Sequence, residues 1–307
     1  MEILRGLESL PDSRLHQSWV TWGVFDGVHR GHQRVIQKLR ELSGENPSVL
    51  ITFDRHPAEV LRGIPVPLVV PMEERFRLMD LLGVDFLLLL PFTREFAETS
   101  AEEFIRSIVI EGVGASGILL GHDSHFGKGR KGDFGYLERL GKELGIPVES
   151  CRPKEQDGRP MSSTLVRERV SSGNMEESAH LLGRPFGLQG VVVPGDRRGT
   201  DLGFPTANVQ LGNSLCPPFG VYVVDAVISG KTYRGAANLG SRPTFYKQGA
   251  PPLLEVHLLD YEGGDLYGVS MEVRFLRRIR DELKFDAVED LKDRMLLDIA
   301  EARREKV

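Results

Sequence analysis

The stretch that decides the fold is residues 19–32, which read Trp-Val-Thr-Trp-Gly-Val-Phe-Asp-Gly-Val-His-Arg-Gly-His. Its first part, Trp19–Phe25, is apolar and typical of a strand, and the residues that follow have a helical period. The stretch therefore predicts a strand-to-helix turn that carries His29 and His32. Such a turn can hold a nucleotide's phosphates on backbone N–H groups and on the helix N-terminus. Gly31 lets the backbone approach a ligand closely, and the two histidines add donors or positive charge.

Around this turn, the first half of the chain alternates strand-like and helix-like segments. The expected strands are 20–25, 49–53, 86–90, 118–120 and 147–149, and the expected helices are 31–42, 73–82, 101–109 and 137–144. Ser100 is expected to cap the third of these helices, with Glu103 three residues on. Alternating elements predict an α/β fold with a parallel sheet covered by helices on both faces. Ligands of such sheets bind beyond the carboxyl ends of the strands, where the histidine turn falls.

The pattern changes near residue 184. Short apolar runs separated by Gly and Pro follow, at 190–193, 220–228, 253–259 and 269–275. They indicate an antiparallel barrel or sandwich, and a last helix is expected from Val288 to about Arg304. The boundary is expected in or just after a helical segment at 175–182, which gives domains 1–183 and 184–307.

Composition narrows the class of protein. The net charge of −5 over 307 residues argues against nucleic-acid binding through an extended positively charged surface. Cys151 and Cys216 are far apart and in no metal-binding spacing, which fits a reducing cytoplasm. No apolar stretch is long enough to span a bilayer, and the first residues lack the apolar core of a signal peptide. We therefore expect a cytoplasmic protein with small-molecule partners and neither a membrane nor a nucleic-acid partner; the oligomeric state is left open.

Two further segments of the first half carry chemistry. Ser162-Ser163-Thr164 precedes a helix that bears Arg167, and these groups can either cap the helix or bind phosphate. Asp123 is followed by the basic, glycine-rich loop 126–133, which is either a ligand-binding loop or a solvated connection.

The second half offers a separate phosphate site. Gly195, Gly199 and Gly203 lie in a glycine-rich segment that can fold over a phosphate chain. Thr206 and Asn208 share one face of an extended segment, and their oxygens suit Mg²⁺.

Glu255 opens the run Glu-Val-His-Leu-Leu-Asp and can act as a general base on a substrate hydroxyl. The plainer alternative makes Thr206 and Asn208 turn residues and Glu255 an exposed strand residue.

The first-half motifs carry a family resemblance. Gly-x-Phe-Asp-Gly-x-His-x-Gly-His at 23–32 and Ser-Ser-Thr-x-Val-Arg at 162–167 resemble the HxGH-type nucleotidyltransferases. The segments 52–57, 83–85 and 126–133 make the chain similar to the adenylyltransferase module of the prokaryotic bifunctional riboflavin kinase/FAD synthetase family. The resemblance implies a Rossmann-like domain that transfers AMP from ATP to FMN. It implies ATP contacts at Gly23, Asp26, His29, His32, Ser162, Ser163 and Arg167, with the histidines and Arg167 stabilising the transition state. It implies flavin contacts at Phe53, His56, Pro57 and Asp123.

The second half resembles the riboflavin kinase module of the same family. The matching motifs are Gly-Phe-Pro-Thr-Ala-Asn at 203–208, Gly-Val-Tyr at 220–222, Asn-Leu-Gly-x-Arg-Pro-Thr-Phe at 238–245, Leu-Tyr-Gly at 266–268 and Ile-Arg-Asp-Glu-x-Lys-Phe at 279–285. The resemblance implies a six-stranded antiparallel Greek-key barrel with a C-terminal helix. It implies Mg²⁺–ATP at Thr206 and Asn208, base catalysis by Glu255, and flavin contacts near Arg280 and Phe285.

The sequence thus predicts an enzyme that makes FMN from riboflavin and ATP, and then FAD from FMN and ATP. One alternative is a kinase with a degenerate first domain. It rests on Arg55, where the family usually has Pro, and on Ser124 and His125, where Asp-Ser-His-Phe replaces the family's Asp-Phe-x-Phe. Thr200 also replaces the Arg or Lys that is common after the loop glycine. The other alternative is a flavin- or nucleotide-binding regulator without turnover.

Overall fold

The computed structural model describes residues 1–121, 124–156, 158–195, 203–211, 215–240 and 252–305. The chain divides into two compact units, Met1–Ser163 and Thr164–Val307. Two of the predicted site residues, Asp123 and Gly199, lie outside the described residues.

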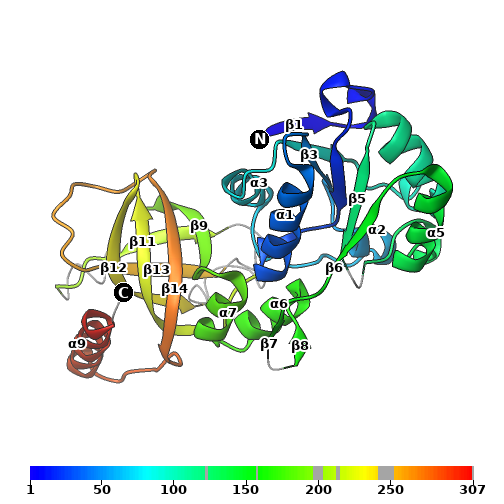
Figure 1. The fold of residues 1–307 in the computed structure, drawn as a ribbon. Helices are drawn as coiled ribbons and strands as arrows, with labels where there is room; N and C mark the ends of the chain where they lie inside the picture. Colours follow the sequence, from blue (N-terminus) through cyan, green and yellow to red (C-terminus); the bar gives the residue numbers. More distant parts are fainter. Residues whose placement is uncertain (122–123, 157, 196–202, 212–214, 241–251, 306–307) are drawn as a thin grey trace. The chain divides into compact units, whose positions relative to one another are not determined.

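The first unit is built on a six-stranded sheet in the order β1-β4-β3-β2-β5-β6, and every pair of neighbours is parallel (Figure 1). The strands are β1 (Glu2–Arg5), β2 (Trp19–Trp22), β3 (Ser48–Phe53), β4 (Phe86–Leu90), β5 (Gly117–Gly121) and β6 (Val148–Cys151). The chain winds from β2 through β3 to β4 and then crosses to β5 on the other side of β2. Such a switch point opens a crevice at the carboxyl ends of the two strands that flank it. The predicted parallel sheet is confirmed.

Helices cover both faces of this sheet because side chains alternate along each strand. Val49 and Ile51 of β3 pack into one core with η5 and α5, while Leu50 between them packs into another with α1 and α3. The helices are α1 (Arg30–Ser43), α2 (Pro57–Arg62), α3 (Met72–Leu81), α4 (Ala101–Glu103), the π-helical η5 (Phe104–Gly112) and α5 (Phe134–Leu144). The 3₁₀ turns are η1 (Leu7–Ser9), η2 (Ser13–Leu15), η3 (Asp26–Val28), η4 (Phe96–Glu98) and η6 (Lys128–Arg130).

Some predicted boundaries are confirmed and others are wrong. The Ser100 hydroxyl accepts a hydrogen bond from the Glu103 N–H (3.0 Å), as the predicted cap requires. The strand predicted to reach Phe25 ends at Trp22, because Phe25 has a φ of 52°, which no strand residue adopts. The edge strand β1 was not predicted.

The second unit begins just after the first residue of α6 (Ser163–Ser171) and continues with α7 (Met175–Leu182). The short strands β7 (Glu155–Gln156) and β8 (Arg159–Pro160) precede it. Six strands then form a closed antiparallel barrel in the order β10-β13-β12-β11-β14-β9 (Figure 1). They are β9 (Phe186–Val193), β10 (Ala207–Leu211), β11 (Gly220–Ile228), β12 (Lys231–Gly240), β13 (Leu253–Leu258) and β14 (Ser270–Arg280). The spatial order β14-β11-β12-β13 is that of a Greek key. The structure therefore decides for a barrel over a sandwich.

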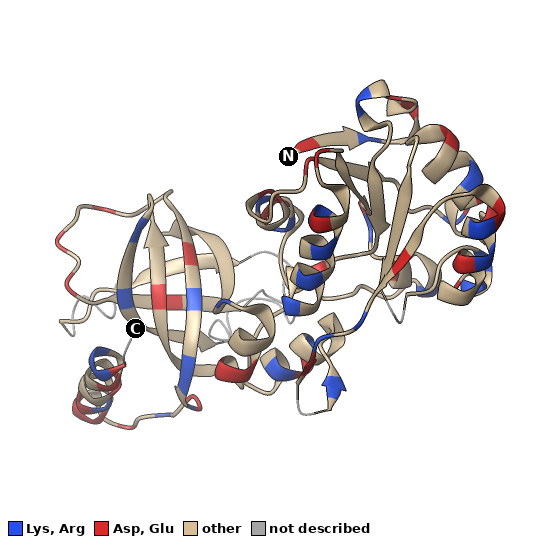
Figure 2. Cartoon of the chain, in the orientation of Figure 1, with Lys and Arg blue, Asp and Glu red and all other residues tan. Residues whose placement is uncertain are grey.

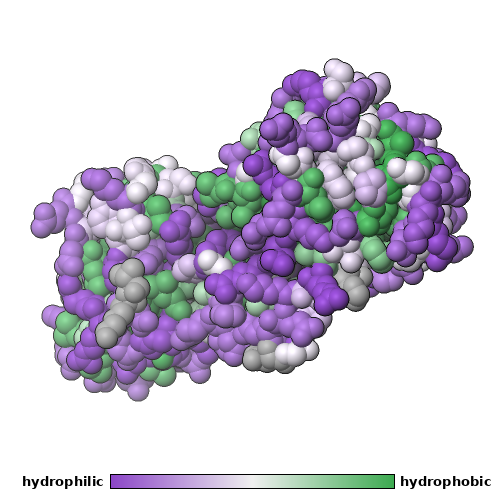
Figure 3. All heavy atoms as spheres, viewed as in Figure 1, coloured by the Kyte–Doolittle hydropathy of each residue, from purple (hydrophilic) through white to green (hydrophobic). Residues whose placement is uncertain are grey.

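The last helix, α9 (Val288–Arg304), packs on the outside of the barrel. Its Ala302 lies in a small core with Val223 of β11 and Ala236 of β12. Charged pairs surround this core, and Figure 2 shows the basic residues along β14. Arg277 of β14 binds Glu301 (3.3 Å) and Glu305 (2.9 Å). The face drawn in Figure 3 is largely hydrophilic, and none of the described helices is long and apolar enough to cross a membrane.

Candidate functional site

The first candidate site is the turn that joins β2 to α1, at the switch point of the sheet. Its backbone is unusual, since Phe25, Gly27 and Val28 have φ values of 52°, 80° and 43°. A β-branched residue such as Val28 rarely adopts a positive φ, and strained residues of this kind gather at functional sites. Phe25 and Val28 are buried at 3% and 1% exposure, and this packing offsets the strain.

The two histidines of the turn act on each other. The Nδ1 atom of His29 accepts a hydrogen bond from the His32 N–H (3.3 Å), which caps α1, and the two rings stack with centroids 3.6 Å apart. The Nδ1 atom of His32 is buried and has no hydrogen-bond partner within the described part of the chain. Burial lowers the pKa of His32 well below its usual value, and electrostatic interactions with His29 and Arg75 lower it further. His32 is therefore a neutral hydrogen-bonding group at pH 7, not the cation that the sequence left open.

Gly31 is fitted closely between its neighbours. A Cβ atom there would lie 2.9 Å from Cε1 of His29 and 3.2 Å from the carbonyl oxygen of Met161. The end of the 152–162 segment thus lies against the start of α1, and Ser162 and Ser163 lie beside the histidine turn. The Ser163 hydroxyl donates a hydrogen bond to the carbonyl oxygen of Asp26 (2.8 Å).

The side chain of Asp26 has a structural partner. It is 1% exposed, and its two oxygens accept hydrogen bonds from the Val69 N–H at 2.9 and 3.1 Å. The carboxylate thereby ties the turn to the segment before α3. Arg167 lies in α6 of the second unit and is half-buried.

The predicted flavin residues lie at the carboxyl end of β3. Phe53 is its last residue, packs edge-to-face on Phe92 (5.1 Å between centroids), and is followed by His56 and Pro57 at the start of α2. The Nδ1 atom of His56 accepts a hydrogen bond from the Ala58 N–H (3.2 Å).

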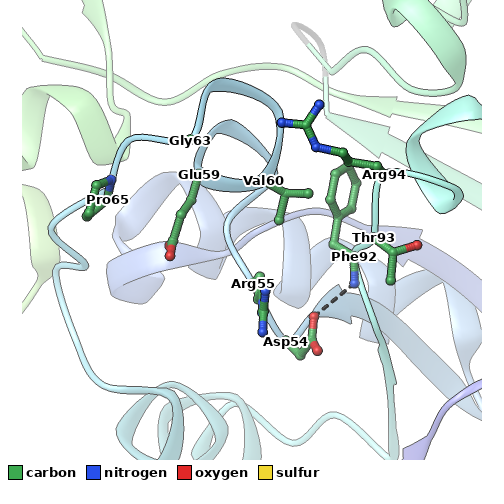
Figure 4. A pocket seen from close by; sticks show the side chains of 9 residues that line it. All are labelled: Asp54, Arg55, Glu59, Val60, Gly63, Pro65, Phe92, Thr93 and Arg94. Carbon is green, nitrogen blue, oxygen red and sulfur yellow. Dashed lines mark hydrogen bonds between the residues drawn. The ribbon is translucent and has the colours of Figure 1, made fainter.

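Beside these residues is a cavity of about 570 Å³, drawn in Figure 4. Its wall comes from the segments that follow β3 and β4: Asp54, Arg55, Glu59, Val60, Gly63, Pro65, Phe92, Thr93 and Arg94. Asp54 accepts a hydrogen bond from the Phe92 N–H (2.8 Å), which holds the two segments together (Figure 4). A cavity of this size suits a flavin-sized ligand. Arg55, one of the departures from the family pattern, lines it directly.

The second candidate site is a row of polar side chains on the barrel. Asn208 of β10 lies directly opposite Glu255 of β13, and Glu255 lies directly opposite Asn238 of β12. Directly opposed residues share one face of the sheet with Cβ atoms about 5 Å apart. The next residues along, Val209 and Leu254, are fully buried in the barrel, so the polar row faces outward. The predicted metal ligand and the predicted base are thus neighbours, and Asn238 is a third member that the sequence analysis gave no role.

The loop before β10 is fixed against the same row. His257 of β13 contacts the Pro205 carbonyl oxygen through Nδ1 (2.9 Å), and its ring packs edge-to-face on Phe204. Thr206 therefore directly follows a residue, Pro205, whose carbonyl oxygen is held by His257. Gly195 approaches Asn208 so closely that a Cβ would clash with the Asn208 amide, and Gly203 has a φ of 89°.

The described residues contain no group of three or more His, Cys, Asp or Glu side chains that could hold a metal ion. The polar row supplies the amides of Asn208 and Asn238 and the carboxylate of Glu255, and Thr206 adds a hydroxyl beside it. Such a set suits Mg²⁺ carried on ATP phosphates, since Mg²⁺ keeps few protein ligands in such sites.

Arg280 is the last residue of β14, and Phe285 lies in the segment that follows this strand. The Arg280 guanidinium binds the Asp298 carboxylate of α9 at 2.6 and 3.1 Å, and Arg294 binds the same carboxylate at 3.1 Å. Asp298 is only 3% exposed. The guanidinium predicted to contact flavin is therefore also an anchor for α9, and the half-buried Phe285 lies in the segment between them.

The fold and these two sets of side chains define a two-domain nucleotide-dependent transferase. An FAD synthetase family model matches residues 12–165 and a riboflavin kinase model matches residues 182–305. The bifunctional riboflavin kinase/FMN adenylyltransferase of Pseudomonas fluorescens is 39% identical over 99% of this chain and 97% of its own. The enzyme of the same name from Bacillus subtilis (strain 168) is 36% identical over 94% of this chain and 92% of its own.

The chain belongs to the bifunctional riboflavin kinase/FMN adenylyltransferase family, as its motifs predicted. A crystal structure from Streptococcus pneumoniae, described as a macrolide-efflux protein, has the same fold throughout. It is 32% identical to this chain, covers 100% of both chains and has a TM-score of 0.90.

Proposed function

We propose that the barrel phosphorylates riboflavin with ATP to give FMN, and that the first unit transfers AMP from ATP to FMN to give FAD and pyrophosphate. The main support is that each family model covers one of the two candidate sites. The FAD synthetase model covers the histidine turn with His29 and His32, and the riboflavin kinase model covers the row with Asn208 and Glu255. We assign residues 1–183 to the adenylyltransferase and 184–307 to the kinase. The two family models leave residues 166–181 unmatched, and most of α6 and most of α7 lie there.

In the kinase site, Glu255 accepts the proton of riboflavin's terminal ribityl hydroxyl as that oxygen bonds to the γ-phosphorus of ATP and ADP departs. Asn208 and Thr206 hold Mg²⁺, and Gly195 and Gly203 let the loop backbone approach the phosphates together with Gly199. Mg²⁺, when bound, neutralises the charge on the phosphate oxygens. Asn238, beside Glu255, orients the base or the flavin hydroxyl. Arg280 and Phe285 contribute to the flavin side.

In the adenylyltransferase site, an oxygen of the FMN phosphate bonds to the α-phosphorus of ATP, and the bond from that phosphorus to the pyrophosphate oxygen breaks. The nucleophile is already ionised, so no strong base is required there. His29, the neutral His32 and Arg167 stabilise the charge on the reacting and leaving phosphates. The backbone of Gly23 and Gly31, with Asp26, Ser162 and Ser163, shapes the phosphate turn.

For the flavin, we propose the cavity beside Phe53, His56 and Pro57 as the binding site, with Asp123 as a further flavin contact. Its walls follow β3 and β4, next to the phosphate turn that follows β2. Cys151 and Cys216 are both free thiols, which fits the reducing cytoplasm that we propose as the compartment.

The test is to incubate the protein with riboflavin and Mg²⁺–ATP and to separate the flavins. FMN and then FAD are expected, and recovery of riboflavin alone would exclude the proposal. A parallel incubation with FMN and ATP should release pyrophosphate. Release of none would leave a kinase with a degenerate first domain.

A further inference from the structure

Arg75 of α3 is a buried arginine of the first unit and is not among the substrate-binding residues proposed for that unit. It is 3% exposed. Its Nη1 atom donates a hydrogen bond to the Val24 carbonyl oxygen (2.7 Å), and its Nη2 atom donates one to the Phe53 carbonyl oxygen (3.1 Å). One guanidinium thus bridges two chain segments that come from different strands.

The bridge lies where β2 and β3 separate. The last backbone hydrogen bond between them runs from the Gly23 N–H to the Ile51 carbonyl oxygen (3.1 Å). Beyond it, within the described residues, the Val24 carbonyl accepts hydrogen bonds from two side chains, Arg75 and the Thr52 hydroxyl (3.3 Å). Val24 begins the histidine turn, and Phe53 ends the strand that leads to the flavin cavity. The guanidinium fork therefore fixes the spacing between the two places where the substrates are proposed to bind.

Burial of this charge is costly, so it calls for an explanation. Burial lowers the pKa of Arg75, while the carboxylates of Asp26 and Glu73 oppose that shift. Its Nε atom is buried and has no hydrogen-bond partner among the residues that the structure describes. A guanidinium left partly unsatisfied between two carbonyls contributes little to folding compared with an apolar side chain of its size. The hydrogen bonds of Arg75 to both chain segments at the site therefore explain this buried charge better than a contribution to folding does.

We propose that Arg75 is a positioning residue of the adenylyltransferase site, which holds the phosphate turn and the flavin strand at the distance that the reaction needs. This inference rests on the proposed function of that site. A fork can bind two carbonyls at once, whereas an ammonium group is a point charge that cannot reproduce this planar geometry. The charge of Arg75 also acts electrostatically on His32, whose ring stacks on that of His29.

The test compares Arg75→Met, Arg75→Lys and the matched control Arg77→Met. Arg77 is two residues further along α3, has a half-exposed side chain, and pairs with the buried Glu74 (2.7 Å). We expect Arg75→Met to lower kcat/KM for FAD formation by about tenfold to a hundredfold, because small displacements of reacting groups cost that much. Arg75→Lys should recover part of the rate, and Arg77→Met should match the wild type. FMN formation by the barrel should be equal in all four proteins, which shows that the second unit is intact. Unchanged fluorescence of Trp19 and Trp22 in β2 should show that the first unit is folded in each.

The pH dependence of FAD formation separates positioning from general stability. Removing the Arg75 charge should raise the pKa of His32, so the acidic limb of the profile should move to higher pH in Arg75→Met and stay in place in Arg75→Lys. A general loss of stability would lower the rate at every pH without this shift. FAD formation in Arg75→Met with wild-type rate and pH profile would overturn the inference. Absence of FAD formation in the wild type would instead overturn the proposed function.

Discussion

Gly31 is the most sensitive point of the histidine turn, and Gly31→Ala tests it. The matched control is Gly135→Ala. Each glycine is the second residue of its helix, α1 or α5, and each helix is capped by the preceding side chain, His29 or Asp133. The two positions differ in their surroundings. A Cβ at Gly135 would meet nothing closer than 3.6 Å, whereas at Gly31 it would meet His29 at 2.9 Å and a backbone oxygen at 3.2 Å.

The structure sets the size of the expected difference. Replacing glycine by alanine within a helix stabilises a protein by up to about 1 kcal/mol, and both variants share this gain. Forcing a methyl group into a packed site costs about 1–3 kcal/mol, and only Gly31→Ala bears that cost. We therefore expect Gly31→Ala to lower the free energy of unfolding of the first unit by up to about 2 kcal/mol, and Gly135→Ala to raise it slightly.

The chain supplies a selective probe for this measurement. Its two tryptophans, Trp19 and Trp22, both lie in β2, so tryptophan fluorescence during urea unfolding reports the first unit alone. The added methyl group should also displace the His29 ring from its cap and from its stack on His32. FAD formation should then fall while FMN formation continues. Equal stability of the two variants, or an unchanged rate of FAD formation in Gly31→Ala, would refute the account of a closely fitted turn.

Two further outcomes follow from buried ionisable groups. Asp298→Ala should destabilise the barrel by about 3 kcal/mol, because it leaves Arg280 and Arg294 without their shared carboxylate; faster amide hydrogen exchange in α9 would show this, and unchanged exchange would refute it. The lowered pKa of His32 means that below about pH 6.5 the unfolded chain binds a proton that the folded chain does not. The free energy of unfolding of the first unit should therefore be highest above that pH with respect to this group. It should fall by up to about 1.4 kcal/mol per pH unit as the pH drops toward the pKa of His32 in the folded protein. His32→Gln should show a shallower loss between about pH 7 and 5.5, and equal slopes would contradict the assignment.

The sequence predicted most of the parallel sheet because its inner strands are continuous apolar runs. β4 was predicted to the residue at Phe86–Leu90, and β3 to within one residue. β1 was missed, since Glu2–Arg5 is a short edge strand with charged ends. The end of β2 was placed too late because apolar Val24 and Phe25 continue the pattern, although the positive φ of Phe25 turns the chain out of the sheet.

The site was predictable only where its residues form a local motif. The histidine turn and the Thr206–Asn208 pair are such motifs. Asn238 joins Glu255 only through the register of β12 and β13, and Arg75 reaches Val24 and Phe53 only through the packing of α3. Barrel closure likewise depends on which strands pair, and the local pattern of each strand does not specify this.

The central claim is that one chain holds two separate active sites, and one pair of variants tests it most directly. Asn208→Ala and His32→Ala should each be assayed for FMN formed from riboflavin and for FAD formed from supplied FMN. We predict that Asn208→Ala loses the first activity and keeps the second, and that His32→Ala does the reverse. Loss of both activities in either variant, in protein that remains folded by amide hydrogen exchange, would contradict the claim.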